Sequence, residues 1–399
     1  MKTKNGSTYF FVRTCAYLVA LLFIGLSGMA QNKAAKKLTA YVNPFIGTAE
    51  HGHVFLGANV PAGFVQLGPS NIMQTWDKFN GWDWCSGYNY ISKEILGFSH
   101  THLSGTGIGD LNDVLLLPAT GKVLLNKMEF NQPETGYGSY FQHEKEVCTP
   151  GYYKVQLDRY AVDAELTATE RVGFHQYHFA NADNPHVVVD LEFGMGWDAV
   201  SNCAIKKLND TTFIGYRFSK GWAADQKLFF AIKLSKQVKG FIAVDSISAL
   251  AGNNITGKRI KAAFLFESGK TFDVKIKVGL SAVSEENALQ NIQAEIPHWN
   301  FEKTKLAAEN KWNKELSTII IEGSDELKEK FYTALYHSLF LPSLYNDANL
   351  QYRGADQKIY QLKNQTNYSI FSLWDTYRGL HPLMTIIQPN RINDYVNSF

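Results

Sequence analysis

The chain has 399 residues, of which 19% are charged and 14% aromatic, and its formal charge is +2. This balance leaves no basic surface for nucleic acid or an anionic membrane, so we expect neither as a partner. The length suits two domains with sizeable cores, and four cysteines are too few for a small disulfide-stapled protein.

Residues 1–30 have the organisation of a secretory signal peptide. A positively charged head precedes an apolar run at 16–26, and small residues end at Ala30. The run is too short for a permanent transmembrane helix, although a buried N-terminal helix is the alternative interpretation. We expect cleavage after Ala30, export to the periplasm or the cell exterior, and no transmembrane segment afterwards. Three basic residues leave with this segment, so the formal charge changes from +2 to −1.

The stretch 81–113 is dense in aromatic, ionisable and glycine residues, and it reads GWDWCSGYNYISKEILGFSHTHLSGTGIGDLND. Its glycines and serines interrupt regular elements, so we expect loops. Loops that carry aromatic and ionisable groups together are frequently binding sites. A sugar pocket needs flat rings for stacking and a few directed polar groups. The composition therefore suggests a carbohydrate site.

Short strands are predicted for most of the first 280 residues. Apolar and polar residues alternate in four segments: His186–Phe193, Thr211–Ser219, Leu228–Leu234 and Phe272–Leu280. Turn-forming residues separate them, and no helical pattern lies between. This pattern favours a large antiparallel β-sandwich over residues 31–280.

Helices are predicted after the sandwich. Ser284 is an N-cap for a first helix that Pro297 closes, and Phe301–Leu316 forms a second. We assign 281–322 to a helical linker. Residues Thr318–Ile321 resemble a brief strand.

A second domain is predicted to begin at residue 323. Ser324 caps a third helix, whose apolar residues step by four and are Leu327, Phe331, Leu335 and Leu339, with Ala334 beside them. Residues 323–399 have room for three helices, and the last, Asn393–Phe399, has no cap. So short a segment buries few apolar faces. We expect the sequence to be the front part of a longer protein or a frameshifted product.

Seven strings of this sequence resemble glycoside hydrolase family 92. They are YVNPFIGT (41–48), HGHVFLGANVPAGFVQLGP (51–69), WDWCSGY (82–88), GFSHTHLSGTG (97–107), AEIPHW (294–299), FYTALYHSLF (331–340) and FSLWDTYRGLHPL (371–383). The resemblance implies an N-terminal β-sandwich, a helical linker and the beginning of a truncated (α/α)6 toroid, which would make residues 323–399 an incomplete catalytic domain. It also implies a calcium-dependent, inverting, exo-acting alpha-mannosidase whose partner is a mannose-containing glycan, with alpha-1,2-linked mannose of N-glycans or mannans as the expected substrate.

The resemblance places the general acid, the general base and most calcium ligands beyond residue 399. An inverting glycosidase needs two carboxyl groups about 6.5–9.5 Å apart. No acid of this sequence matches that pair by motif. We therefore assign no catalytic and no metal-binding residue, and we expect little or no hydrolysis by this chain alone.

Substrate-binding residues are expected at Trp374, Asp375 and Arg378. The resemblance places this segment at the floor of the sugar pocket, where the aspartate accepts hydrogen bonds from mannose hydroxyls. A carboxylate accepts from two neighbouring hydroxyls, and a guanidinium holds such a carboxylate through its fork of donors. The alternative is a surface ion pair of small energetic value.

The string around Trp82 supplies further candidates. Trp82 and Trp84 would point to the same side of an extended chain, and either ring could stack on a sugar, the alternative being core packing. Cys85 is a candidate lining residue rather than a nucleophile, because no ordered Cys-His-acid set is visible.

Two histidine pairs, His51 with His53 and His100 with His102, suggest either zinc or a polar role. Their spacing matches no standard zinc signature. We therefore assign His100 and His102 to substrate binding, with structural histidines as the alternative. Asp110–Asp113 fails the calcium-loop pattern, since Leu115 stands where the loop requires glycine.

Three functions remain open from the sequence: part of an alpha-mannosidase, a non-catalytic carbohydrate-binding β-sandwich module, and a sandwich that serves only for docking. The first is favoured. Nothing in the sequence indicates an oligomeric state.

Overall fold

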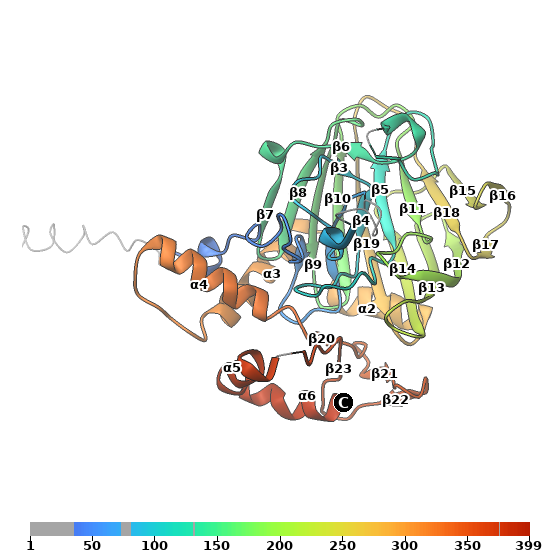
Figure 1. Ribbon diagram of the computed structural model, residues 1–399. Coiled ribbons are helices and arrows are strands. Elements are labelled where there is room, and N and C mark those ends of the chain that lie inside the picture. The colour runs from blue at the N-terminus through green and yellow to red at the C-terminus, as the bar shows by residue number, and fades with distance from the viewer. Residues whose placement is uncertain (1–35, 73–80, 131, 375) are drawn as a thin grey trace, which may run out of the picture.

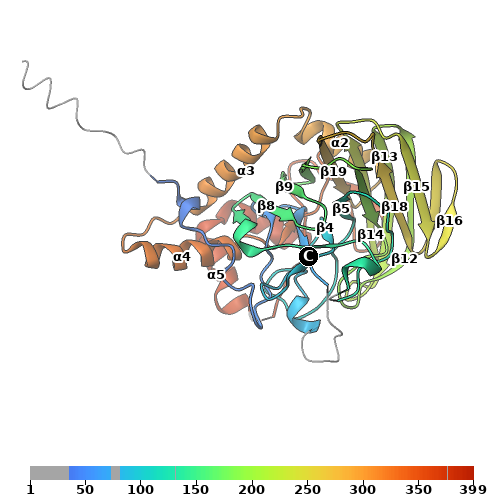
Figure 2. The same cartoon turned by 90° about the horizontal axis from the view of Figure 1, so that it is seen from above.

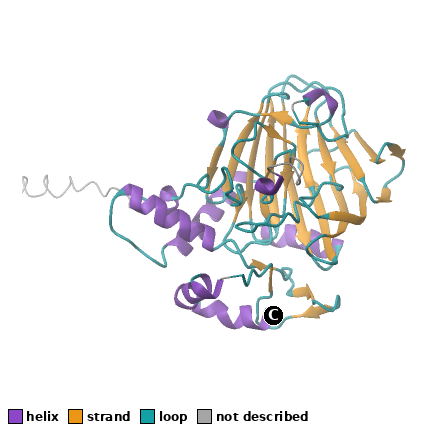
Figure 3. Ribbon diagram, in the orientation of Figure 1, coloured by secondary structure: helices purple, strands orange, loops and turns teal. Residues whose placement is uncertain are grey.

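The computed structural model describes residues 36–72, 81–130, 132–374 and 376–399, so the predicted signal peptide lies outside the described residues. Two large antiparallel sheets form a sandwich, and a smaller segment of helices and hairpins lies below it in Figure 1. Figure 3 shows the same division, with strands filling the upper body and helices at its flank and below.

The first sheet has nine strands in the order β17-β12-β13-β14-β19-β10-β9-β8-β7. Their bounds are β7 Val147–Thr149, β8 Tyr152–Leu157, β9 Val162–Ala168, β10 Val172–Phe179, β12 Ala199–Asn209, β13 Thr212–Lys220, β14 Gln226–Leu234, β17 Asn254–Gly257 and β19 Phe272–Ser281. The alternating segments predicted as strands thus form β13, β14 and β19. Polar residues face outward along them because side chains alternate between the two faces of a strand.

The second sheet has eight strands in the order β1-β2-β4-β5-β11-β18-β15-β16. Their bounds are β1 Ala58–Asn59, β2 Gln66–Ser70, β4 Gly97–Ser99, β5 Leu115–Ala119, β11 His186–Asp190, β15 Gly240–Asp245, β16 Ser248–Leu250 and β18 Ile260–Leu265. Three short pairs complete the described strands: β3 Glu94–Ile95 with β6 Ser139–Tyr140, β20 Ser343–Leu344 with β23 Tyr368–Ser369, and β21 Gln351–Arg353 with β22 Ile359–Gln361.

Helices follow the sandwich as the capping signals predicted. α2 (Glu285–Glu295), α3 (Phe301–Leu316) and α4 (Asp325–Ser338) begin after Ser284, Asn300 and Ser324, whose side-chain oxygens each accept a backbone N–H of the first turn. α5 (Leu380–Ile387) and α6 (Ile392–Ser398) complete the described α-helices. Short 3₁₀ turns are η1 Leu38–Tyr41, η2 Gly81–Trp84, η3 Pro133–Thr135, η4 His143–Lys145, η5 Thr376–Arg378 and η6 Pro389–Arg391. The described helices include none long and apolar enough to cross a bilayer.

Two details of the helical prediction were wrong. Residues 318–321, which are described, belong to no strand, because the chain leaves α3 through turns and no neighbouring strand pairs with it. On α4 the buried face includes Tyr332, Leu335 and Tyr336, whereas Leu327 is 51% exposed. The buried face thus contains Leu335 and Leu339 of the predicted stripe together with Tyr332 and Tyr336, and of the four stripe residues only Leu327, at the start of the helix, departs from it.

The segment after α3 is fastened to the sandwich by a shared core and by backbone bonds. Val42 and Phe55 pack with Tyr336 of α4 and with Leu339, directly after that helix, in one buried cluster. Ala62 donates its N–H to the carbonyl of Leu339 at 3.0 Å and accepts the N–H of Leu344 at 2.8 Å. Figure 2 shows α3 and α4 near each other at the flank of the sheets. The division into domains at 280 and 322 and the toroid remain predictions.

Candidate functional site

A cavity of about 190 Å³ lies between a sandwich loop and the C-terminal segment. The loop contributes Ser104, Gly105 and Thr106. The remaining lining residues are His337, Ser338, Phe340, Leu341, Pro342, Ile370, Phe371, Ser372, Trp374, Thr376, Leu380 and His381. The cavity therefore has polar hydroxyl and imidazole groups on an otherwise apolar wall, which is the usual mixture of a small-molecule site.

The sandwich loop at the cavity is held in place by its neighbours on both sides. Gly105 donates its N–H to the carbonyl of His53 at 2.7 Å. The Cys85 thiol donates to the carbonyl of Thr106 at 2.9 Å, and the Trp82 indole donates to the carbonyl of Gly107 at 2.9 Å. Because the 81–85 segment supplies two of these three donors, Trp82 in η2 and Cys85 directly after it, this segment positions the loop that forms one wall of the cavity.

Two polar atoms in this cavity wall have no hydrogen-bond partner among the described residues. They are Thr106 Oγ1 and His337 Nε2, and both are buried. Burial lowers the pKa of His337 to about 4, so the imidazole is neutral at neutral pH. A buried polar atom without a partner costs free energy, so these two side chains have hydrogen-bonding capacity that the chain itself leaves unused. Sequence reasoning named neither residue: Thr106 lies in the 81–113 stretch without having been singled out, and His337 lies in a string quoted only for its resemblance.

The predicted pocket-floor segment contributes one exposed ring to the cavity. Trp374 lines it and is 85% exposed. Arg378 lies in η5 with its guanidinium 5.6 Å from the ring centroid of Tyr377, and it is not part of the cavity wall. Asp375 lies outside the described residues. The structure thus brings Trp374, but not Arg378, to the cavity.

The two tryptophans of the 82–84 string do not share a side. Because η2 is a 3₁₀ turn rather than an extended strand, the side chains diverge. Trp82 is 42% exposed and packs edge-on against His53 with ring centroids 4.1 Å apart. Trp84 is buried, donates to Ser92 Oγ at 2.8 Å and lines a different cavity of about 590 Å³. Neither ring lines the first cavity, and Trp82 is connected to it only by the bond to Gly107, the neighbour of the lining residue Thr106.

Cys85 and the other two described cysteines are buried free thiols. Burial raises the pKa of Cys85 to about 12, so the thiol is protonated at neutral pH. Cys85 contacts the cavity only through the backbone of Thr106. Its part in the site is to hold the loop, in place of the predicted lining role.

His100 and His102 lie in the sandwich core rather than at the cavity. His100 bonds the carbonyl of Val114 at 2.6 Å and His175 Nε2 at 2.9 Å. His102 bonds the carbonyl of Gln66 at 2.8 Å and Ser99 Oγ at 3.0 Å. Burial lowers the pKa of His100 to about 3 and that of His102 to about 4. Enclosed in this way, neither imidazole is accessible to a sugar.

The described residues contain no group of three His, Cys, Asp or Glu side chains placed to bind a metal ion. Asp83 contacts both His51, at 2.8 Å, and His53, at 3.9 Å. These two contacts do not involve His100 or His102. The carboxylate of Asp113 already accepts hydrogen bonds from Thr101, Gln226 and Arg217. No zinc or calcium ligand set can therefore be assigned to these residues.

Two domain families match the chain. The glycosyl hydrolase family 92 N-terminal domain matches residues 41–281, and the family 92 catalytic domain matches residues 287–399. An uncharacterised secreted glycosidase from Arthroderma benhamiae is 26% identical over 372 residues, which make up 85% of this chain and 45% of that protein.

Solved structures resemble the chain closely. A family 92 alpha-mannosidase from Bacteroides thetaiotaomicron, also solved in complex with mannoimidazole, is 34% identical with a TM-score of 0.86, over 91% of this chain and 49% of that one. An inverting family 92 mannosidase from Bacteroides thetaiotaomicron VPI-5482 is 24% identical with a TM-score of 0.79. The match covers 92% of this chain and 48% of that one, and it shows likeness of fold. The chain spans about half the length of these relatives.

Proposed function

The chain belongs to glycosyl hydrolase family 92, and from this premise we propose that it forms the sandwich and the first part of the catalytic domain of an exo-acting alpha-mannosidase. The cavity with the unpartnered atoms Thr106 Oγ1 and His337 Nε2 is the observation that carries the proposal. A terminal mannose has several neighbouring hydroxyls, so a single sugar could satisfy both atoms at once.

We propose that the cavity holds the non-reducing terminal mannose of an alpha-1,2-linked glycan. Thr106 and His337 would bond its hydroxyls, while Trp374 would offer a flat apolar face at the rim. Trp82 and Trp84 are proposed as substrate-binding residues from the family resemblance alone. Asp375 and Arg378 are proposed from the family resemblance to complete the polar contacts.

An inverting hydrolysis is the proposed reaction of the complete site. It requires one carboxylic acid for the leaving oxygen and one carboxylate for the water, about 6.5–9.5 Å apart. The described lining residues of the cavity include no Asp or Glu. We therefore propose no acid or base within the described chain, and we propose that the chain alone hydrolyses alpha-mannosides slowly or not at all.

Calcium is proposed as the cofactor of the complete site on the family resemblance alone. Because the described residues form no three-residue ligand group, no step is assigned to the ion and no residue is assigned to bind it. Calorimetric titration of the chain with calcium chloride is expected to give no saturable heat, and micromolar binding would contradict this assignment.

Export through cleavage of residues 1–30 is likewise proposed. The secreted relative from Arthroderma benhamiae and the charged and apolar parts of the segment support it. Expression of the full sequence with N-terminal sequencing of the product tests it. A mature protein that begins at Gln31 is expected, and an intact Met1 in the exported fraction would contradict it.

Binding to the cavity is tested by calorimetric titration with alpha-1,2-mannobiose. Trp374→Ala and His337→Leu are each expected to weaken binding by about tenfold, the equivalent of roughly 1.4 kcal/mol. Ile386→Ala, on an exposed residue of α5 outside the cavity, serves as the control. Equal affinity of the parent and both cavity variants would contradict the proposal.

A non-catalytic carbohydrate-binding module is the second candidate, favoured by the lack of carboxyl groups among the described lining residues. Mannose release from mannobiose, followed by proton NMR of the anomeric signal, is expected to be slow or absent for both candidates, and rapid turnover with the beta anomer formed first would contradict the proposed inactivity of the chain alone. The DNA after the Phe399 codon separates the two candidates: an open reading frame there supports the enzyme, and a stop codon supports the module. If the chain binds no sugar at all, the remaining candidate is a sandwich that serves only for docking.

A further inference from the structure

Two exposed tryptophans form a second aromatic site away from the cavity wall. Trp197 lies between β11 and β12, and Trp222 lies in the turn between β13 and β14. Their ring centroids are 6.2 Å apart with an angle of 23° between the planes. The residues are 48% and 68% exposed, although tryptophan is highly buried on average. Two large rings exposed side by side present adjoining flat apolar faces to solvent, which is the kind of surface on which a ligand can stack.

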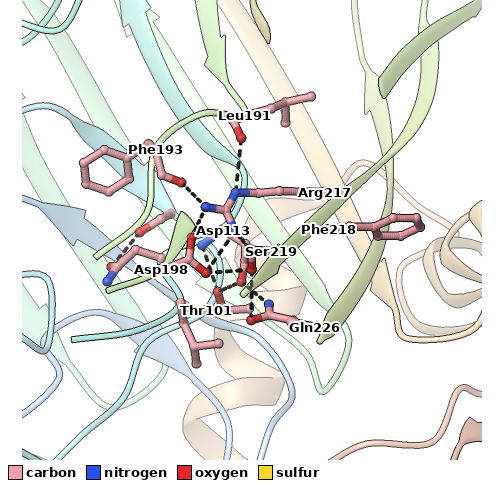
Figure 4. Close-up of polar contacts among 12 residues, drawn as sticks. Thr101, Asp113, Leu191, Phe193, Asp198, Arg217, Phe218, Ser219 and Gln226 are labelled. Carbon is pink, nitrogen blue, oxygen red and sulfur yellow. Dashed lines mark hydrogen bonds and ion pairs between the residues drawn. The ribbon is translucent and has the colours of Figure 1, made fainter. Parts of the chain in front are cut away.

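The loop that carries Trp197 is rigid because the next residue, Asp198, belongs to a buried polar network. Figure 4 shows the Arg217 guanidinium between Asp113 and Asp198. Arg217 also donates to the carbonyl of Phe193 at 2.7 Å, and Ser219 donates to Asp198 at 2.7 Å. The Arg217 side chain is fully buried. The chain is thereby held on both sides of Trp197, at Phe193 before it and at Asp198 after it.

Both tryptophan loops are fastened to the same short segment, Gly109–Asp110. Trp197 donates its N–H to the carbonyl of Gly109 at 3.1 Å. Ala223, the neighbour of Trp222, donates its N–H to Asp110 Oδ2 at 3.0 Å. The rings are therefore presented by anchored backbone, so a ligand that binds them orders little additional chain.

The same segment connects this aromatic site to the cavity. Gly105 lines the cavity. Asp110 lies five residues further along the chain and accepts the N–H of Ala223, the neighbour of Trp222. Five residues span at most about 18 Å when fully extended. A single oligosaccharide is long enough to reach both places.

The surroundings of the two rings favour a neutral ligand. The charged side chains near the rings are of both signs and give no purely cationic surface: Lys220 and Asp225 lie close to Trp222 in the chain, and the neighbouring hollow at Gly196 is lined by Lys127, Lys258, Arg259, Glu192, Asp198 and Asp245. The charge of the adjacent Asp198 is buried against Arg217. Nucleic acid and anionic lipid need cationic groups at the contact, whereas a neutral pyranose presents an apolar C–H face that fits a flat ring.

We propose that Trp197 and Trp222 form a second carbohydrate-binding platform, which holds a mannose unit distant from the terminal mannose in the cavity. The identity of the sugar rests on the proposed function. The platform would increase affinity for long mannan chains over mannose and mannobiose, because two connected contacts act on one ligand.

Affinity electrophoresis in gels with yeast alpha-mannan, together with calorimetry on mannobiose, tests the platform. Trp197→Ala and Trp222→Ala are expected to weaken mannan binding by about tenfold each and to leave mannobiose affinity unchanged. Trp197→Phe is expected to retain most of the mannan affinity because it keeps a ring. Phe130→Ala, at an aromatic residue of similar exposure (47%), is the matched control.

The failure of the platform and the failure of the cavity are distinguishable in this experiment. Mannan affinity unchanged in Trp197→Ala and Trp222→Ala overturns the platform, whether or not mannobiose binds. Mannobiose binding that is absent in the parent chain overturns the cavity proposal, and the platform then stands only if mannan binding still depends on the two tryptophans. A parent chain that binds neither sugar overturns both.

Discussion

At the scale of single residues, burial decides the chemistry of the histidines in the sandwich core. His100 and His102 are enclosed between strands, and burial lowers the pKa of each well below 6.5. Above pH 6.5 these imidazoles are neutral in both the folded and the unfolded chain. Below it the unfolded chain takes up protons that the folded chain refuses, so folding stability decreases toward acid pH.

The free energy of unfolding is therefore expected to fall between pH 7.5 and pH 5. Each of the two histidines contributes a loss of about 2 kcal/mol at pH 5, on the basis of roughly 1.36 kcal/mol per pH unit below 6.5. Urea unfolding curves at both pH values measure it. His102→Gln should have a lower free energy of unfolding than the parent at pH 7.5. Its free energy of unfolding should nevertheless decrease less than that of the parent between pH 7.5 and pH 5. An unchanged pH dependence in this variant would contradict the assignment.

Buried thiols give a second prediction at this scale. Burial raises the pKa of Cys85 to about 12 and that of Cys203 to about 11. Since the thiolate is the reactive form, we expect neither to be alkylated by iodoacetamide at pH 8 in the folded protein. Peptide mass spectrometry with and without denaturant measures the labelling. Rapid modification of Cys85 in the native state would show that the 81–85 segment opens.

At the scale of elements, Trp312 is one of the residues that attach α3 to the sandwich. Its ring is fully buried, and the indole donates to the carbonyl of Asn59 in β1 at 2.8 Å. It also packs 4.3 Å from the ring centroid of Tyr336 in α4. One side chain therefore joins two helices and the edge of a sheet.

Trp312→Ala is expected to reduce the free energy of unfolding by about 3–5 kcal/mol, because it leaves a cavity and an unpaired carbonyl. Leu306→Ala, on the exposed face of the same helix, is expected to change it by less than about 0.5 kcal/mol since Leu306 is 52% exposed. Urea denaturation followed by circular dichroism measures both. Similar effects of the two substitutions would refute the role of Trp312.

At the scale of the whole molecule, the sandwich and the C-terminal segment share a core. Val42 and Phe55 from the sandwich side lie in one cluster with Phe340 and Tyr395. Backbone bonds from Ala62 to Leu339 and from Leu344 to Ala62 cross the same boundary. Because apolar side chains from both parts are buried together, neither part keeps its burial when the other unfolds.

A single cooperative unfolding transition is accordingly expected for the described chain. Tryptophan fluorescence and far-ultraviolet circular dichroism should give the same urea midpoint. Phe340→Ala should lower both midpoints together, whereas Val396→Ala, at a residue 65% exposed, should lower neither. Two separated midpoints in the parent would show that the parts fold independently.

The local elements of this fold were predictable because their causes lie within a few residues. The alternation at Phe272–Leu280 forms β19, and Ser284 and Ser324 cap helices where their position indicated. Strand alternation depends on neighbours two apart, and capping on a bond to a residue three further on. The resemblance to family 92 was readable for the same reason, since its strings are contiguous.

The candidate site could be predicted only in part. Trp374 lines the cavity as expected, but Thr106 and His337, which hold its unpartnered atoms, belong to segments far apart in the sequence. His100 and Trp84 are buried by strands and loops that no local pattern connects to them. Burial and pairing are set by contacts between distant segments, so packing in three dimensions had to determine them.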